Sequence, residues 1–275
     1  LPAIPQLGID QPIPLLVAPQ LDVAMIYAFA LSSIAVYGVV LGGWASNNKY
    51  SFLGGLRSSA QRISYELPLG LGLLGVVLAS SSLRLDQIIE AQANGVWYLW
   101  MQPLGFVVFI VAAFAEAGRL PFDLPEAEQE LVGGYHTEYS GMKLVLYLTA
   151  EFIHMITAAF LIVILFFGGW HLPWITGHDT SIGWGMALLR IAVLRGKTFL
   201  VIFLFMMVRW SWPRFRFDQL MSLAWKVMLP LGLLNLVAVA IVTELQHTGV
   251  LGEISVWLVC LIGWGVMLLG WILVA

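Results

Sequence analysis

Residues 143–167 read KLVLYLTAEFIHMITAAFLIVILFF. Lys143 and Glu151 are the only fully charged residues in this run, which is otherwise almost entirely apolar. An α-helix needs about 20 apolar residues to cross the hydrocarbon core of a bilayer. Such a helix also pairs its own backbone N–H and C=O groups, as lipid requires. The run therefore predicts a membrane-spanning helix that carries a carboxylate, Glu151, with His154 nearly one turn further on.

The composition of the whole chain agrees with a membrane location. Hydrophobic residues make up 60% of the 275 residues and charged residues only 11%, with a mean hydropathy of +0.89. A soluble domain has about 45–50% apolar and about 25% charged residues. The net charge of −3 argues against nucleic-acid binding, and the single Cys260 excludes an internal disulfide, a Cys-ligated iron–sulfur cluster and a Cys-rich zinc site. We expect one all-α integral membrane domain over residues 1–275.

Seven apolar runs are candidate membrane spans. The expected spans are 20–43, 67–83, 99–117, 143–167, 186–208, 224–244 and 254–275. The second run is short and rich in glycine, so its helix is expected to begin earlier, inside the preceding polar stretch. The first 19 residues contain five prolines and are expected to form a loop. No signal peptide is visible.

The distribution of Lys and Arg predicts the orientation in the membrane. Loops 44–66, 118–142 and 209–226, with the flanking Lys143, hold nine of the 13 cations. The alternate loops hold Arg84 and little else. By the positive-inside rule the first set faces the cytoplasm, with the N-terminal stretch outside and the C-terminus inside. Two of these regions, 44–66 and 116–142, are too specific in sequence to be simple connectors, and we interpret them as functional cytoplasmic loops.

The second of these loops concentrates negative charge. Four carboxylates, Asp123, Glu126, Glu128 and Glu130, fall within eight residues, and Asp123 with Glu126 suggests a helix start. On such a helix Glu126 and Glu130 share a face, where like charges disfavour joint ionisation. The alternative is an ordinary solvated acidic loop. The apolar residues interleaved with the acids favour the functional interpretation.

Charges within or beside the spans are the second signal. Glu66, Glu116 and Glu151 lie in or at the edge of spans, and intramembrane acids often mark ion or proton paths. The alternative for Glu66 and Glu116 is a location at the interface, where the side chains reach water. His154 is more simply a satisfied core histidine than a redox or metal ligand. Either the basic pair Arg195 and Lys197 lies at the outer interface, or one of the two lies inside, paired with a carboxylate.

Four polar stretches carry a family resemblance. Residues 43–57 read GWASNNKYSFLGGLR, 60–66 read AQRISYE, 119–131 read RLPFDLPEAEQEL within a matched stretch to Ser140, and 209–221 read RWSWPRFRFDQLM within one to Pro230. Together they resemble the H subunit of the proton-pumping NADH:quinone oxidoreductases, respiratory complex I. The resemblance covers most of residues 20–245.

The resemblance implies a core membrane subunit that helps form the quinone-binding chamber and couples quinone reduction to proton translocation through buried carboxylates. The chain would be part of an enzyme without a complete active site of its own. By position, the resemblance implies a proton path of Glu66, Glu116, Glu151, Asp123, Glu126, Glu128, Glu130, Glu138 and Lys197. It implies a quinone chamber and peripheral-arm contact at Arg57, Arg62, Arg119, Phe122, Asp123 and Tyr135.

The expected partners follow from the same resemblance. They are peripheral subunits at the quinone site, antiporter-like subunits of the membrane arm, quinone as substrate and the lipid bilayer. FMN and iron–sulfur clusters are expected in partner subunits, whereas neither a cofactor nor a metal is expected in this chain. The bacterial inner membrane is the expected location.

The chain also departs from the family pattern. The family begins with two further spans that are absent here, so part of the natural chain is expected to be missing. Gly118 stands where the family often has Asn, and 254–275 is an additional span, with Trp257, Trp264 and Trp271 spaced by seven. Two alternatives remain: the homologous subunit of an energy-converting hydrogenase-type complex, and a stand-alone transporter. The transporter predicts inverted repeats, which the sequence does not display.

Overall fold

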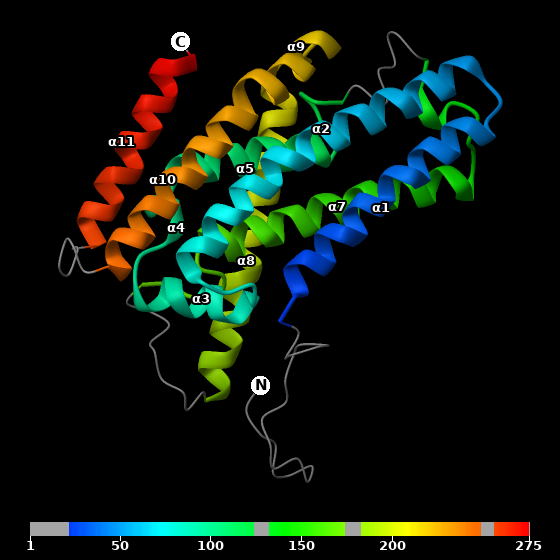
Figure 1. The fold of residues 1–275 in the computed structure, drawn as a ribbon. Coiled ribbons are helices and arrows are strands. Elements are labelled where there is room, and N and C mark those ends of the chain that lie inside the picture. The colour runs from blue at the N-terminus through cyan, green and yellow to red at the C-terminus, as the bar shows by residue number, and fades with distance from the viewer. Residues whose placement is uncertain (1–21, 124–131, 174–182, 249–255, 275) are drawn as a thin grey trace.

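A computed structural model describes residues 22–123, 132–173, 183–248 and 256–274 (Figure 1). Within these ranges the chain is helical, with no β-strand. Five helices are long and apolar enough to cross a membrane, and two shorter apolar helices span Pro103–Glu116 and Trp257–Leu273. The prediction of an all-α polytopic membrane bundle is confirmed.

The helices follow one another with short connections. In chain order they are α1 (Ala24–Ala45), α2 (Lys49–Ser80), α3 (Leu85–Asn94), α4 (Tyr98–Met101), α5 (Pro103–Glu116), the 3₁₀ turn η2 (Gly134–His136), α7 (Met142–Phe166), α8 (Trp184–Ser211), α9 (Phe217–Ser222), the π-helical segment η3 (Leu223–Met228), α10 (Leu229–His247) and α11 (Val256–Val274).

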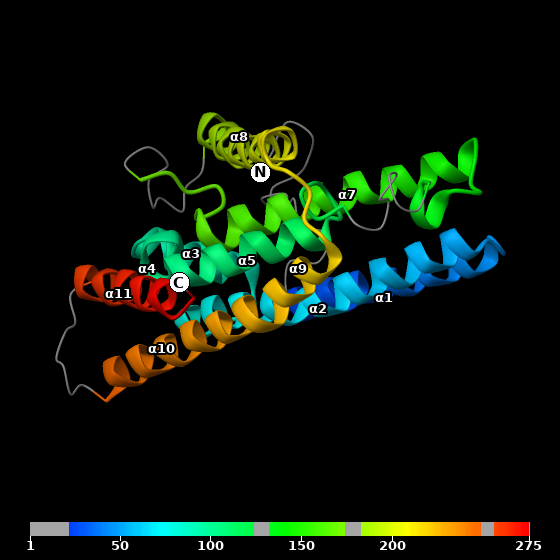
Figure 2. The same cartoon turned by 90° about the horizontal axis from the view of Figure 1, so that it is seen from above.

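Helix α2 lies at the centre of the bundle. It packs against α1, α5 and α10, while α7 contacts both α5 and α8. Figure 2 shows α8 and α10 on opposite sides, with α5, α7 and α2 between them. The C-terminal α11 packs on α4, α5 and α10. The buried apolar core runs through α2, α5 and α7, and includes Tyr65, Phe109 and Phe166.

The expectation that the second helix begins inside the preceding polar stretch is confirmed, and most of the expected loop 44–66 is therefore helical, which corrects the boundaries 44–66 and 67–83. Residues 49–80 form one helix of 32 residues, whose first turn is capped by the Asn48 side chain accepting from the Tyr50 N–H. At 1.5 Å per residue this helix is about 48 Å long, which exceeds the roughly 30 Å hydrocarbon core. The polar segment is therefore the part of α2 that continues beyond the lipid.

The third expected span, 99–117, is interrupted. Helix α4 ends at Met101 and α5 begins at Pro103, because proline lacks a backbone N–H and disfavours helical geometry in the residue before it. The sixth expected span, 224–244, is part of a longer helical segment, Phe217–Gln246. The remaining four spans agree with α1, α7, α8 and α11 to within a few residues.

The connections rich in Lys and Arg lie away from α3 and α4. The α1–α2 turn and residues 132–141 lie at the right of Figure 1, and α9, which follows the α8–α9 connection, lies at its top centre. The backbones of α2 and η2 approach closely: a Cβ on Gly54 would lie 2.7 Å from the Tyr135 nitrogen. Only glycine permits this contact between α2 and η2, which brings Tyr135 to α7.

Candidate functional site

Glu116 is the last residue of α5, and side chains from three other helices lie near its carboxylate. Ser32 of α1 donates its hydroxyl to Glu116 Oε1 at 2.5 Å. His154 of α7 places its Nε2 3.3 Å from the same oxygen. Arg62 of α2 adds a nearby positive charge. The Glu116 side chain is only 13% exposed, so these groups supply most of its polar environment.

Glu66 joins the same cluster through α1. Ser33 donates its hydroxyl to Glu66 Oε1, while the neighbouring Ser32 binds Glu116. Two adjacent side chains of one helix thus connect the acids of α2 and α5. The structure therefore brings together two acids that are 50 positions apart in the sequence.

Glu151 of α7 is buried and held from two directions. The Tyr135 hydroxyl donates to Glu151 Oε1 at 2.6 Å, and Arg119 Nη2 lies 3.7 Å from Glu151 Oε2. The Arg119 guanidinium also lies 4.3 Å from the centre of the Phe152 ring. A buried carboxylate needs such partners, because removing a charge from water is costly. Since His154 follows Glu151 by three residues on α7, this pair continues the cluster around Glu116.

We call this set the acid network: Glu66, Ser33, Ser32, Glu116, His154, Glu151, Tyr135 and Arg119. It includes residues of α1, α2, α5 and α7, together with Arg119 after α5 and Tyr135 of η2, which packs on α2. Each contact joins a carboxylate to a hydroxyl, an imidazole or a guanidinium. These groups can donate, accept or stabilise protons, so the arrangement can support proton transfer through the membrane domain.

An aromatic cluster adjoins the network. The Phe122 ring stacks on Phe215 with centroids 5.5 Å apart, and the Tyr65 ring lies 5.8 Å from Phe122. Tyr65 also donates its hydroxyl to the Leu220 carbonyl of α9 at 3.0 Å. Gln61 holds the other side by donating to the Ala115 and Phe122 carbonyls at 2.7 and 2.8 Å. The segment after α5 is thereby fixed between α2 and α9.

Charged side chains surround this aromatic cluster. Arg214 donates to Asp123 Oδ2 at 3.1 Å, which ties the segment after α5 to the α8–α9 connection. Arg57 of α2 lies 5.9 Å from the Phe217 ring. The chain turns after α5 at Gly118, whose φ of +63° suits glycine, and passes through a cis bond between Leu120 and Pro121.

The structure places the predicted site residues in different parts of the molecule. Glu66, Glu116, Glu151, Arg119 and Tyr135 belong to the acid network, with Arg62 beside it, while Arg57, Phe122 and Asp123 belong to the aromatic cluster. Glu126, Glu128 and Glu130 lie outside the described residues. Glu138 stands apart: it accepts from Asn48 Nδ2 at 2.6 Å and lines a surface hollow with Lys143.

Lys197 differs most from expectation. It lies at the other end of the bundle, where its Nζ donates to the carbonyls of Phe167, Gly169 and His171 at 2.6, 3.1 and 2.6 Å. Its ammonium also lies 4.6 Å from the Trp97 ring. Of the two alternatives for Arg195 and Lys197, pairing with a carboxylate is not found for Lys197 among the described residues. Backbone carbonyls beyond the end of α7 compensate the charge instead.

Sequence reasoning missed two members of the network and undervalued a third. Ser32 and Ser33 carry no charge and lie in an apolar span. Their occurrence as two adjacent polar residues in that span was the only signal that could have identified them as site residues. His154 was interpreted as a core residue, whereas its contact is with an acid of another helix. Its spacing from Glu151 was the available signal, since residues three apart share a helix face.

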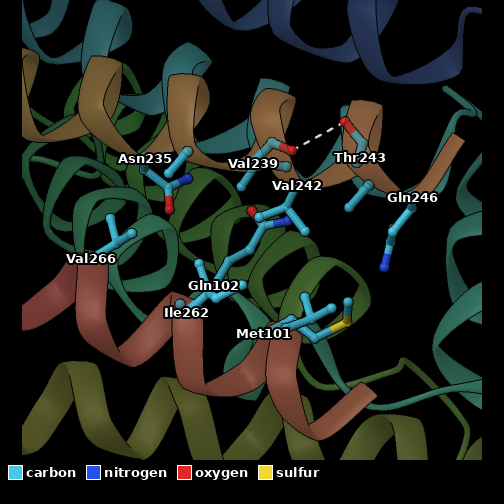
Figure 3. A pocket seen from close by; sticks show the side chains of 13 residues that line it. Met101, Gln102, Asn235, Val239, Val242, Thr243, Gln246, Ile262 and Val266 are labelled. Atoms are coloured by element: carbon cyan, nitrogen blue, oxygen red, sulfur yellow. Dashed lines mark hydrogen bonds between the residues drawn. The ribbon is translucent and has the colours of Figure 1, made fainter. Parts of the chain in front are cut away.

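An apolar pocket lies away from the network. It is lined by α10, α11 and the α4–α5 break, with Gln102, Asn235 and Thr243 among mainly aliphatic side chains (Figure 3). Thr243 donates to the Val239 carbonyl of its own helix at 3.0 Å. This pocket does not include any acid of the network.

Comparisons with known proteins agree with this architecture. A family profile described as NADH dehydrogenase matches residues 2–240. Subunit 8 of the NADH-quinone oxidoreductase from Rhodothermus marinus is 50% identical over 232 residues, covering 80% of this chain and 67% of the relative.

Two further relatives are similar, and both are H subunits of NADH-quinone oxidoreductases. The one from Protochlamydia amoebophila is 49% identical over 81% of this chain and 64% of its own length. The one from Bacillus thuringiensis is 48% identical over 82% and 65%. The chain thus spans about two thirds of the length of these relatives. Both the profile and the relatives cover most of the sequence, and the chain belongs to the NADH dehydrogenase family that includes the H subunits of NADH-quinone oxidoreductases.

Proposed function

We propose that this chain is the membrane subunit of a respiratory NADH:quinone oxidoreductase that couples quinone reduction to proton translocation. The names of its relatives support membership in such an enzyme. The acid network is the observation that carries the proposal, because it connects the buried Glu151 and the partly buried Glu66 and Glu116 through side chains of several helices. Apolar packing alone would not require acids, serines and a histidine to converge inside a membrane domain.

The quinone chamber would form beside the aromatic cluster. A quinone has a flat apolar body and two carbonyl oxygens, so its site needs apolar walls and a few hydrogen-bond donors. Phe122 and its aromatic neighbours suit the ring, while Arg57, Arg62, Arg119 and Tyr135 offer donors. Asp123 completes the chamber through its contact with Arg214.

The coupling would operate through charge. Quinone reduction takes up protons and changes the charge near the end of α5, which alters the proton affinity of Glu66 and Glu116. The change then passes through the network to Glu151. The chain supplies the path, and the electrons come from FMN and iron–sulfur clusters in partner subunits. Peripheral quinone-site subunits, antiporter-like subunits and a bacterial inner membrane complete the proposed assembly.

The first test replaces Glu151 with Gln in the assembled complex in membrane vesicles. The amide keeps the size of the side chain but does not carry a proton at neutral pH. We expect fewer protons translocated per electron. Glu90→Gln is the matched control, because Glu90 is an exposed residue of α3 and belongs neither to the network nor to the expected proton path. A normal proton-to-electron ratio in Glu151→Gln would remove Glu151 from the path.

The second test addresses the chamber. Asp123→Asn weakens the ion pair with Arg214 and should slow electron transfer to quinone, while transfer to an artificial acceptor that bypasses quinone continues. Asp86→Asn, at the opposite end of the bundle, is the control. Equal loss of both activities in Asp123→Asn would point to impaired assembly and would argue against a role at the quinone.

A further inference from the structure

We propose that His154 carries protons between Glu116 and Glu151. This inference rests on the function proposed above and assigns a transfer step within it to one residue. His154 is placed between the two halves of the acid network: its ring contacts Glu116 across the α5–α7 interface, and its own helix leads back to Glu151.

The contact with Glu116 is direct. Nε2 of His154 lies 3.3 Å from Glu116 Oε1, within reach of a proton transfer along a hydrogen bond. Side chains three residues apart on a helix have Cβ atoms about 5–6 Å apart, which places Glu151 on the adjoining surface of α7. The His154 side chain is 23% exposed, so the described residues do not enclose its ring on every side.

The transfer can be written with protons conserved. A proton leaves the Glu116 carboxyl as its O–H bond breaks, and an N–H bond forms at Nε2 of His154. The imidazolium then releases the proton from Nδ1 to the Glu151 carboxylate, directly after ring rotation or through one water. Imidazole suits this step because one ring nitrogen accepts while the other donates.

The surrounding charges favour a mobile proton. Glu116 faces His154 from α5, and Arg62 of α2 contributes a positive charge near that acid. On α7, Glu151 is compensated by Arg119 and by a neutral tyrosine hydroxyl. His154 thus lies between two carboxylates that each have an arginine nearby, Arg62 beside Glu116 and Arg119 beside Glu151.

The competing explanation is that His154 only holds Glu116 in place. A hydrogen-bond donor that cannot be protonated would serve that purpose equally well. His154→Gln makes this distinction, since glutamine retains an N–H donor for Glu116 but cannot relay a proton. Met155→Leu, a volume-conserving change at the next residue, is the control for packing on α7.

The experiment measures quinone-linked turnover and protons per electron in the assembled complex, across the pH range around neutrality. We expect His154→Gln to lose about tenfold or more of its coupled turnover, as for removal of a general acid–base group, and to show an altered pH profile. His154→Ala should regain part of the rate when imidazole is added, in proportion to the imidazole concentration. Met155→Leu should not respond to imidazole.

Full coupling in His154→Gln would overturn the inference and assign the residue to positioning. Loss of assembly in both His154→Gln and His154→Asn on native gels would also overturn it, because the residue would then belong to the fold. Glu116→Gln, measured in parallel, tests the proposed function separately from the proton-transfer role of His154. Normal pumping in Glu116→Gln contradicts the proposed function, whereas a defect there with normal His154→Gln contradicts only the inference.

Discussion

Lys197→Met tests whether this lysine caps a helix or carries protons. The resemblance places Lys197 in the proton path, but the structure gives its ammonium three backbone carbonyls just beyond the end of α7. Methionine has a similar length and no donor. We expect the variant to destabilise the α7–α8 end of the subunit and to leave proton coupling intact in the complexes that assemble.

The magnitude follows from the bonds removed. A hydrogen bond to a charged group contributes about 1.5–3 kcal/mol, and a cation at a helix C-terminus adds about 0.3–1 kcal/mol. The three bonds share one ammonium and are not additive, since water at the helix end compensates part of the loss. We therefore expect a destabilisation of about 3–5 kcal/mol, centred on the contact between α7 and α8.

The assay is the midpoint temperature at which the purified complex loses the subunit on native gels, together with protons per electron. Lys197→Met should lower the midpoint by at least about 5 °C. Arg195→Met is the matched control, because Arg195 lies on the same helix, is exposed and has no ion pair among the described residues. An unchanged midpoint with lost proton coupling in Lys197→Met would refute the capping role.

Three other changes test the packing. Gly54→Ala should impair assembly, because the added Cβ would lie 2.7–2.9 Å from the η2 backbone. Gly70→Ala should be tolerated, because the space around Gly70 is open. The yield of assembled complex measures both effects. Gln61→Leu leaves two buried carbonyls without their donor and should cost about 2–3 kcal/mol, seen as a lower dissociation temperature. Hydrogen bonding from Arg84 lowers the pKa of Asp86, so this pair stabilises α3 fully above the ordinary carboxyl pKa, and the stabilisation is lost as the pH falls through the lowered pKa. Asp86→Asn should remove this acid dependence from hydrogen exchange in α3. An unchanged dependence would contradict the assignment.

Most of the fold was predictable because lipid imposes simple rules. A long apolar run such as 143–167 is stable in lipid as an α-helix, because the helix satisfies its own backbone hydrogen bonds. The observed α7 begins and ends within one residue of this run. The start of α2 was not predictable from hydropathy. Its N-terminal half buries small and polar residues, among them Ser51, Gly54 and Gly55, against neighbouring elements, while larger apolar residues such as Phe52 and Leu56 are exposed. Hydropathy reports contact with lipid, but helix formation beyond the lipid depends on packing.

The charged residues of the site could be predicted from the sequence, but the side chains that contact them could not. Glu66, Glu116 and Glu151 were identifiable because an acid in an apolar run is costly. Their mutual arrangement depends on which neutral side chains face them, and a sequence gives no sign that Ser32 and Ser33 turn toward two different acids. Lys197 illustrates the converse: its charge was conspicuous, but its partners are backbone carbonyls, which every residue possesses.

The continuity of α2 fixes the spacing between its polar end and its acid. Asn48, the N-cap of α2, and Glu66 are 18 positions apart, which corresponds to about 27 Å along the helix axis. Inserting one residue between them would turn Glu66 by about 100° relative to Asn48 and shift it by about 1.5 Å. A loop absorbs such an insertion, but a helix transmits it, and Glu66 would lose Ser33. The length of this segment is therefore as strictly constrained as the identity of the acid.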